Sequence, residues 1–203
     1  MQKSKQTPNY KQAKFLTSAA QLSQLPNDTG VEVAFIGRSN VGKSSALNAL
    51  TGQKNLVRVS KTPGRTQLIN LFALSDTQRL VDLPGYGYAK VSKKTKQDWE
   101  KLIDAYLRKR SCLRGLVLLM DIRHPLQEFD VQLLTWTKQI NLPIHILLTK
   151  TDKLSFGAGK NISQKVQKEV MKINSAASIQ LFSAHKSIGH DELKKTLNQW
   201  FRS

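Results

Sequence analysis

The chain has 203 residues, of which 39% are hydrophobic and 23% charged, proportions that are typical of a globular domain and exclude a disordered polymer. Lys and Arg number 32 against 14 Asp and Glu, so the formal net charge is +18. This excess predicts a polyanionic partner: nucleic acid, an anionic membrane or a phosphate-rich ligand. A basic surface without any partner is the alternative.

No apolar run approaches the roughly 18 residues that a membrane-spanning helix needs, so we predict no membrane span. The lysines near the N-terminus are not followed by the apolar stretch of a signal peptide. Cys112 is the only cysteine, which excludes a disulfide within the chain and a cysteine-rich zinc site. Because an apolar segment follows it, we expect Cys112 to fill the core. These features favour a cytoplasmic protein.

Residues 1–30 are polar and contain Pro8 and Pro26, so we expect a basic N-terminal tail and a connecting segment there. Residues 31–203 are expected to form a single domain. Within it, apolar segments predict strands over 31–36, 68–74, 79–83, 115–121, 143–149 and 179–183. Helical spacing of apolar residues predicts helices over 44–51, 92–110, 126–140, 163–174 and 191–201.

This alternation predicts an α/β fold with a mostly parallel central sheet and helices on both faces. Ligands of such sheets bind beyond the carboxyl ends of the strands. The motifs described below follow predicted strands, which places them at that edge.

The first motif lies between the strand at 31–36 and the helix at 44–51. Its sequence matches the phosphate-binding pattern G-x-x-x-x-G-K-[ST] of P-loop NTPases: Gly37-Arg38-Ser39-Asn40-Val41-Gly42-Lys43-Ser44. Glycine lets the backbone wrap around phosphate oxygens, and the helix start adds a positive dipole. Lys43 is expected to neutralise the β- and γ-phosphates and Ser44 to ligate Mg²⁺. A glycine-rich turn with a chance lysine is the alternative, which this context disfavours.

The second motif, Asp82-Leu83-Pro84-Gly85, ends the predicted strand at 79–83. Asp82 suits the acidic residue that holds the magnesium shell through water. Gly85 suits a backbone N–H that touches the γ-phosphate and moves when this group leaves. Asp-x-Pro-Gly alone is also a common turn sequence. Its place two strands after the first motif favours the phosphate-binding role.

The third motif, Thr149-Lys150-Thr151-Asp152, ends the strand at 143–149 and points to guanine as the base. The Asp152 carboxylate can accept hydrogen bonds from guanine N1–H and the 2-amino group, a donor pair that adenine lacks. The aliphatic part of Lys150 can cover the base plane. A helix N-cap is the alternative role for Asp152. Backbone N–H groups of Ser183-Ala184-His185-Lys186, at the end of the strand predicted over 179–183, could meet the guanine oxygen.

Together these motifs resemble the EngB family (also called YihA or YsxC) of translation-factor-like GTPases, within the TrmE-Era-EngA-EngB-Septin-like group. The resemblance spans residues 21–201. Besides the three motifs it rests on four further pieces of sequence: Ser45, Thr62-Pro63-Gly64-Arg65-Thr66-Gln67, Tyr86-Gly87-Tyr88-Ala89 and Phe182-Ser183-Ala184. It implies a small-GTPase-like domain that binds GTP or GDP with Mg²⁺ and hydrolyses GTP.

The resemblance also implies roles that the residues alone do not assign. The segment at 62–67 is the first switch of the family, which makes Thr66 rather than Thr62 the second hydroxyl ligand of Mg²⁺, beside Ser44 and Asp82. Catalytic roles are implied for Lys43, Asn40, Thr66 and Gly85. Further nucleotide contacts are implied for Ser45, Gly64, Arg65, Gln67, Leu68 and Phe182. Thr149 stands where most GTPases have Asn, as it often does in this family, so Asp152 carries the base selectivity.

Hydrolysis is expected to be slow, in the range of about 10⁻⁴ to 10⁻² s⁻¹ for unassisted small GTPases. Many of those enzymes have a water-positioning Gln directly after the glycine of the second motif, where this chain has Tyr86. A phenol there could pack or touch a partner. No arginine finger is identifiable, since Arg38 and Arg65 suit packing or partner contacts. By analogy with related GTPases, Asn40 could support K⁺ as a substitute positive charge. Tolerance of a tight loop is the alternative role for Asn40.

The active site needs only a few cations, so most of the excess charge requires another explanation. Basic clusters lie at Lys90, Lys93, Lys94 and Lys96, at Arg108-Lys109-Arg110 and from Lys3 to Lys14. The first cluster follows the second motif, so the γ-phosphate could control its contact with RNA. The resemblance implies ribosomal RNA in large-subunit assembly as the partner, and a link to cell division and septation. We expect a monomeric protein. A constitutive RNA-binding protein and a generic ATPase are the alternatives, which Gly85 and Asp152 disfavour.

Overall fold

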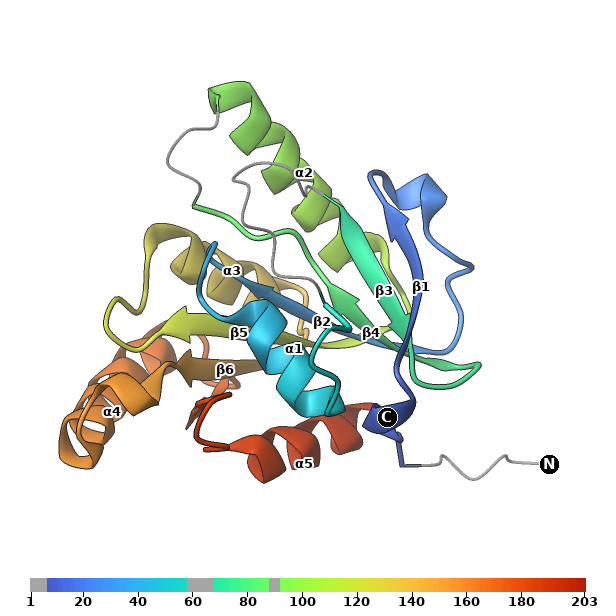
Figure 1. Cartoon of the computed structure of the whole chain (residues 1–203). Helices are drawn as coiled ribbons and strands as arrows, with labels where there is room; N and C mark the ends of the chain where they lie inside the picture. The colour runs from blue at the N-terminus through green and yellow to red at the C-terminus, as the bar shows by residue number, and fades with distance from the viewer. Residues whose placement is uncertain (1–6, 58–67, 88–91) are drawn as a thin grey trace.

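The computed structural model describes residues 7–57, 68–87 and 92–203 (Figure 1). Its centre is a seven-stranded sheet with the order β1-β3-β4-β2-β5-β6-β7. Strands β4, β2, β5, β6 and β7 are parallel to one another, whereas β1 and β3 add two antiparallel pairs at one edge. The strands span Lys14–Ala19 (β1), Val31–Gly37 (β2), Ile69–Ala73 (β3), Gln78–Asp82 (β4), Leu113–Asp121 (β5), Ile144–Thr149 (β6) and Ser178–Leu181 (β7).

In the described residues, five α-helices cover both faces of the sheet, as the sequence predicts. They span Lys43–Thr51 (α1), Lys93–Lys109 (α2), Glu128–Gln139 (α3), Phe156–Ile173 (α4) and His190–Trp200 (α5), and three short 3₁₀ helices span Tyr10–Gln12 (η1), Leu22–Gln24 (η2) and Thr151–Lys153 (η3). Helices α1 and α5 pack against one face, and α2, α3 and α4 against the other (Figure 1). The α/β fold with a mostly parallel sheet is therefore confirmed.

Strand β2 shows why two cores form. Val33 and Phe35 point into the core beneath α1 and α5, while Ala34 and Ile36 point into the core beneath α2, α3 and α4. Successive strand residues point to opposite faces, so a buried parallel strand must be apolar throughout. No helix in the described part of the chain is both long and apolar enough to span a membrane.

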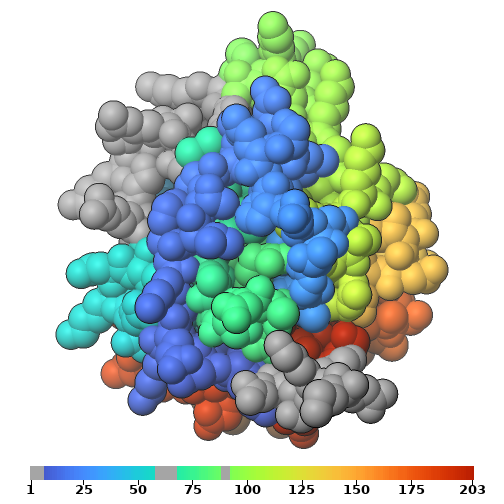
Figure 2. Space-filling model, turned by 90° about the vertical axis from the view of Figure 1, so that its right-hand side faces the viewer, coloured from blue at the N-terminus to red at the C-terminus, as the bar shows by residue number. Residues whose placement is uncertain are grey.

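The N-terminal region is more structured than the sequence predicts. Residues 14–19, expected in a tail or connector, form the edge strand β1 antiparallel to β3, and the preceding 3₁₀ helix buries Tyr10. The Tyr10 hydroxyl donates to Asn198 Oδ1 of α5 at 2.7 Å. Figure 2 shows this N-terminal segment lying along the molecule beside the β3–β4 hairpin. The expectation of a tail is therefore wrong for these residues. The sequence signal of this edge strand is weak, because Ala19 is the one buried residue of the strand and Lys14, Phe15 and Leu16 are exposed.

Helix α4 also differs from the prediction, since it begins at Phe156 and not near residue 163. The Ser155 hydroxyl caps it by accepting a hydrogen bond from the Ala158 N–H at 3.3 Å. The first turn contains Gly157 and Gly159, which have low helix propensity and hide the helical period. The cap and the tertiary packing outweigh that propensity.

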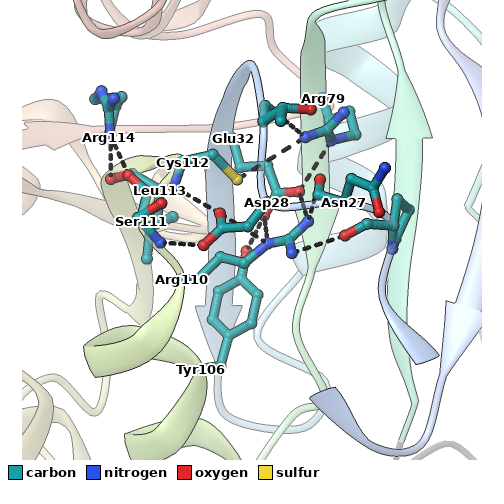
Figure 3. A network of polar contacts seen from close by, with 12 residues as sticks. Asn27, Asp28, Glu32, Arg79, Tyr106, Arg110, Ser111, Cys112, Leu113 and Arg114 are labelled. Carbon is teal, nitrogen blue, oxygen red and sulfur yellow. Dashed lines mark hydrogen bonds and ion pairs between the residues drawn. The ribbon is translucent and has the colours of Figure 1, made fainter. Parts of the chain in front are cut away.

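A buried charge network lies at the amino ends of the parallel strands (Figure 3). Glu32 of β2 is fully buried and accepts hydrogen bonds from Arg79 of β4 at 2.9 Å and from Arg110 at 2.7 and 2.9 Å. The Tyr106 hydroxyl of α2 donates to the same carboxylate at 2.9 Å. Burial alone would raise the pKa of Glu32, but the Arg110 hydrogen bond and charge turn the net shift downward. The network therefore fixes the C-terminal end of α2 to the sheet.

Cys112 lies at the border of this network and is buried, which confirms its expected place in the core. Burial raises the pKa of the Cys112 thiol to about 12. A neutral thiol is a poor nucleophile.

Replacing Glu32 by Ala is expected to lower the free energy of unfolding by about 3–5 kcal/mol, because the Arg79 and Arg110 guanidinium groups would lose their buried carboxylate. Urea unfolding followed by circular dichroism measures this change. Asp104→Ala is the matched control, since Asp104 pairs with Arg108 on the partly exposed face of α2, and it should cost less than about 1 kcal/mol. Equal losses in the two variants would contradict a dominant role for the buried network.

Candidate nucleotide-binding site

The phosphate-loop motif joins the end of β2 to the start of α1, as the sequence predicts. Gly37 is confined, because a Cβ there would lie 2.8 Å from both the Leu119 carbonyl oxygen and a methyl of Val41. Asn40 and Gly42 both have positive φ angles, 62° and 105°. Asn tolerates this region better than most residues and Gly adopts it freely, so the sequence allows the loop to curl around a centre.

A cavity of about 1150 Å³ lies over this loop and brings together residues from all three motifs. It exceeds the usual range for small-molecule sites, roughly 300–1,000 Å³. The predicted site residues among its lining are Arg38, Ser39, Asn40, Gly42, Lys43, Ser44, Ser45, Leu68, Asp82, Pro84, Gly85 and Lys150. The predicted residues Gly64, Arg65, Thr66 and Gln67 lie outside the described residues, as does Lys90.

Lys43 and Asp82 form an ion pair within the cavity lining. Both side chains are largely shielded from solvent, at 13% and 7% exposure. Asp82 is the last residue of β4, and Lys43 is the first of α1. The pairing of β2 with β4 thus brings the cation of the first motif and the carboxylate of the second into contact.

The second motif lies directly against the phosphate loop. The Ser39 N–H donates to the Tyr86 carbonyl oxygen at 2.7 Å, and the Tyr86 N–H donates to the Gly37 carbonyl oxygen at 3.4 Å. A Cβ at Gly85 would lie 3.2 Å from that same Gly37 oxygen. The close approach of the two backbones explains the glycine at position 85.

The side chain of Tyr86 points into the protein and not into the cavity. It is only 6% exposed, and its hydroxyl donates to Oδ1 of Asp130 at the start of α3. Its ring packs against Trp99 and Phe129, with centroid distances of 5.6 and 4.8 Å. Of the two roles that the sequence leaves open for this phenol, the structure therefore supports packing.

Thr149 braces the phosphate loop. Its hydroxyl donates to the Val41 carbonyl oxygen at 2.7 Å and lies 3.1 Å from that of Met120. Lys150 has a φ angle of 61°, and its ammonium donates to the Asn40 carbonyl oxygen at 2.7 Å. The shorter Thr side chain thus holds the loop with a single hydroxyl.

Asp121 is a site residue that sequence reasoning missed. It ends β5 and pairs with Lys150 at 3.0 Å and with Arg123 at 2.7 Å. The Arg123 hydrogen bonds hold the pKa of Asp121 well below its ordinary value. The available signal was positional, since an acidic residue at the carboxyl end of a central parallel strand lies at the ligand-binding edge.

Asp152 lies in the short helix η3 after β6, and Ser183 follows β7. The Ser183 hydroxyl donates to Asp152 Oδ1 at 2.7 Å and thereby lowers the pKa of this carboxyl. The Thr151 hydroxyl donates to the Phe182 carbonyl oxygen at 3.1 Å. The last two predicted base-binding segments are therefore bonded to one another, and Asp152 is held ionised at neutral pH.

The fold and the three motifs define a P-loop GTPase, and comparison with known proteins gives the family. Residues 32–150 match a family model described as 50S ribosome-binding GTPase. A probable GTP-binding protein EngB from Coxiella burnetii (strain CbuG_Q212) is 58% identical over 196 residues, which cover 97% of this chain and 96% of that protein. Its counterpart from Edwardsiella ictaluri is 53% identical over 197 residues, which cover 97% and 91%.

Comparison with solved structures gives the same fold. The crystal structure of a probable GTP-binding protein EngB matches with a TM-score of 0.69 and 21% identity, covering 85% of this chain and 99% of that one. Era in complex with MgGDPNP and nucleotides 1506–1542 of 16S ribosomal RNA matches with a TM-score of 0.61 and 25% identity, covering 85% and 57%. The chain belongs to the EngB family of GTP-binding proteins and is a GTPase.

Replacing Asp152 by Asn is expected to weaken GTP binding by about 10- to 100-fold, because charge-assisted hydrogen bonds to the base would be lost. ATP binding, which is expected to be weak in the unmodified protein, should not change. Titration with fluorescent GTP and ATP measures both affinities. Ser183→Ala, which removes only the hydroxyl that orients Asp152, should give a smaller loss for GTP. A preference for ATP in the unmodified protein would overturn the guanine assignment.

Proposed function

We propose that this GTPase is a nucleotide-switched factor in the assembly of the large ribosomal subunit. The observation that carries the proposal is the meeting of Lys43, Asp82 and Gly85 around one cavity in a chain of net charge +18. The family description, 50S ribosome-binding GTPase, supports the large subunit as the partner, and the 16S ribosomal RNA bound to Era supports ribosomal RNA as the class of ligand. The family resemblance adds a role in cell division and septation. We also propose a cytoplasmic location and a monomeric state, with residues 31–203 as the GTP-binding domain extended by strand β1 of the same sheet.

Mg²⁺ fits the chemistry of the residues beside Lys43. Ser44 and Asp82 line the same cavity and offer a hydroxyl and a carboxylate, the hard oxygen ligands that Mg²⁺ prefers. We assign these two residues and Thr66 to the metal. When bound, the ion neutralises charge on the β- and γ-phosphates. Lys43 then neutralises phosphate oxygens in place of its partner Asp82, and the Gly85 N–H donates to the γ-phosphate.

The remaining residues predicted for the nucleotide divide into two groups. Loop backbone N–H groups face the phosphates, and Asp152 selects the base with Lys150 over its plane. Gly37, Val41, Leu83, Thr149, Thr151, Asp152, Phe182, Ser183 and Ala184 are not in the cavity lining. Ser183 orients Asp152 through its hydroxyl, and the N–H groups of Ser183 and Ala184 are assigned to the guanine oxygen.

Basal hydrolysis is slow in this proposal, because the side chain at position 86 is buried and bonded to Asp130. A water-orienting group must reach the attacking water next to the γ-phosphate. A ribosomal partner or a monovalent cation therefore supplies the missing stabilisation of the transition state.

K⁺ is the cation that we propose for this role, at the loop residue Asn40. The Asn40 φ angle of 62° also fits the simpler role of tolerating a tight loop. We expect turnover to be faster in K⁺ than in Na⁺ at equal ionic strength, and Asn40→Ala to remove the difference. Steady-state phosphate release measures both. Equal rates in the two salts, unchanged by the substitution, would remove K⁺ from the mechanism.

The exposed lysines of helix α2 support ribosomal RNA as the proposed partner. Lys93, Lys94 and Lys101 of α2 are exposed, and no ion pair of theirs is found among the described residues. Lys93 and Lys94 open the helix that follows the second motif, so a shift of Gly85 would move them. This placement supports a nucleotide-gated contact with ribosomal RNA.

Co-sedimentation with purified large-subunit precursors tests the switch. Binding should be at least about tenfold tighter with a non-hydrolysable GTP analogue than with GDP, and it should fall steeply with salt because each neutralised phosphate releases counterions. Replacing both Lys93 and Lys94 by Ala should lower the salt slope by about 2.

The matched control removes the same charge from α4, by replacing Lys165 and Lys168 with Ala; both are exposed and far along the chain from the second motif. This control should retain the nucleotide dependence. Identical binding with GTP analogue, with GDP and without nucleotide would favour constitutive RNA binding over a switch. Binding that does not change with salt concentration would mean that the excess positive charge is a property of the surface composition and does not serve RNA binding.

A further inference from the structure

Three aromatic rings and one carboxylate meet behind the second motif, on the side away from the cavity. Tyr86, Trp99 of α2 and Phe129 of α3 pack together, with the Trp99 and Phe129 centroids 4.6 Å apart. All three side chains are less than 9% exposed. The cluster joins two helices to the loop that contains Gly85.

The Asp130 carboxylate anchors this aromatic cluster through hydrogen bonds. One carboxylate oxygen accepts the Tyr86 hydroxyl hydrogen bond, and the other accepts the Gln127 N–H at 2.8 Å at the start of α3. Asp130 is 2% exposed, and this burial raises the pKa of its carboxyl to about 6. At pH 7.5 the buried group is therefore mainly ionised, and an ionised carboxylate in a shielded position is a strong acceptor for the phenol.

The backbone of the second motif is held at the residues on both sides of Gly85. The Trp99 indole N–H donates to the Pro84 carbonyl oxygen at 3.2 Å, and the Tyr86 carbonyl oxygen accepts the Ser39 N–H at 2.7 Å. Gly85 thus lies between two anchored carbonyl groups. The Tyr86 side chain sets the orientation of the second group, because its far end is fixed to Asp130.

Arg38 of the phosphate loop lies beside the second motif and links it to that loop. A Cβ at Gly87 would lie 2.7 Å from the Arg38 Cγ, so the arginine stem fills the space that a side chain at position 87 would need. The Arg38 charge also acts on both Tyr86 and Asp130. The loop, the second motif and α3 therefore form one connected unit.

We propose that Tyr86 is a positioning residue for GTP: its bond to Asp130 holds the Gly85 backbone where its N–H can meet the γ-phosphate. The proposal rests on the γ-phosphate role of Gly85 given above. Tyr86 thus contributes to recognition of the third phosphate through the backbone, although its side chain cannot reach the attacking water. GDP lacks the γ-phosphate and should not sense this anchor.

Tyr86→Phe removes only the hydroxyl and is the direct test. We expect affinity for a non-hydrolysable GTP analogue to fall about tenfold while GDP affinity stays within twofold, and single-turnover hydrolysis to slow by a similar factor. Asp130→Ala should give the same loss. Because Asp130→Ala also removes the bond from the Gln127 N–H, the double variant should lower the ratio of GTP-analogue to GDP affinity no further than Asp130→Ala alone, in which the Tyr86–Asp130 bond is already absent.

Tyr106→Phe is the matched control, since it also removes a buried phenol that donates to a carboxylate, here Glu32 at the opposite end of the sheet. Both Phe variants should lower the melting temperature, but only Tyr86→Phe should lower the ratio of GTP-analogue to GDP affinity. An unchanged ratio in Tyr86→Phe, with stability lost as in Tyr106→Phe, would reduce Tyr86 to a structural residue.

Gly85→Ala separates this inference from the role on which it rests. The added Cβ would press on the Gly37 carbonyl oxygen, so the ratio should fall if Gly85 meets the γ-phosphate. A ratio that changes in Gly85→Ala but not in Tyr86→Phe overturns the inference alone. A ratio unchanged in both overturns the role of Gly85 as well.

Discussion

The parallel register of four central strands is the constraint on which the rest of the structure depends. Strand β2 pairs with β4 so that Phe35 lies opposite Asp82, and with β5 so that Gly37 lies opposite Leu119. Strand β6 then places Thr149 opposite Asp121. A shift of one residue would turn each apolar side chain from one core to the other, so burial on both faces fixes the register. The motifs meet at one edge because this register aligns the strand ends.

The phosphate loop is held from several sides. Asn40 is a non-glycine residue with a positive φ angle, a conformation that persists where the surroundings over-determine it. Here Thr149 and Lys150 hold the carbonyl groups of Val41 and Asn40, and Tyr86 holds the N–H of Ser39. The binding conformation is therefore built largely by the protein itself, which reduces the ordering that a nucleotide must impose.

The sequence was sufficient to predict an element where its apolar residues are strongly periodic or where a motif has a fixed spacing. The parallel strands and the Gly37–Ser44 loop could be predicted, because buried strands are apolar and the loop chemistry allows few alternatives. Strand β1 could not, since Lys14, Phe15 and Leu16 lie exposed on an edge and show no alternation. The glycine-rich first turn of α4 was hidden for a similar reason. The Tyr86–Asp130 bond joins residues 44 positions apart, and no local pattern reports such a contact.

The buried network at Glu32 has a mechanical consequence. It fixes α2 at Tyr106 and Arg110, near the C-terminal end of the helix, whereas Trp99 joins its middle to the second motif. A helix of 17 residues is about 25 Å long. A rotation of about 10° around the Glu32 end would therefore displace Lys93 by about 4 Å and Trp99 by roughly half to two thirds of that distance. Helix α2 is thus fixed at its C-terminal end, at the edge of the sheet opposite the nucleotide site. Its N-terminal end, which carries the positive charge of Lys93 and Lys94, is the end that a rotation would move most.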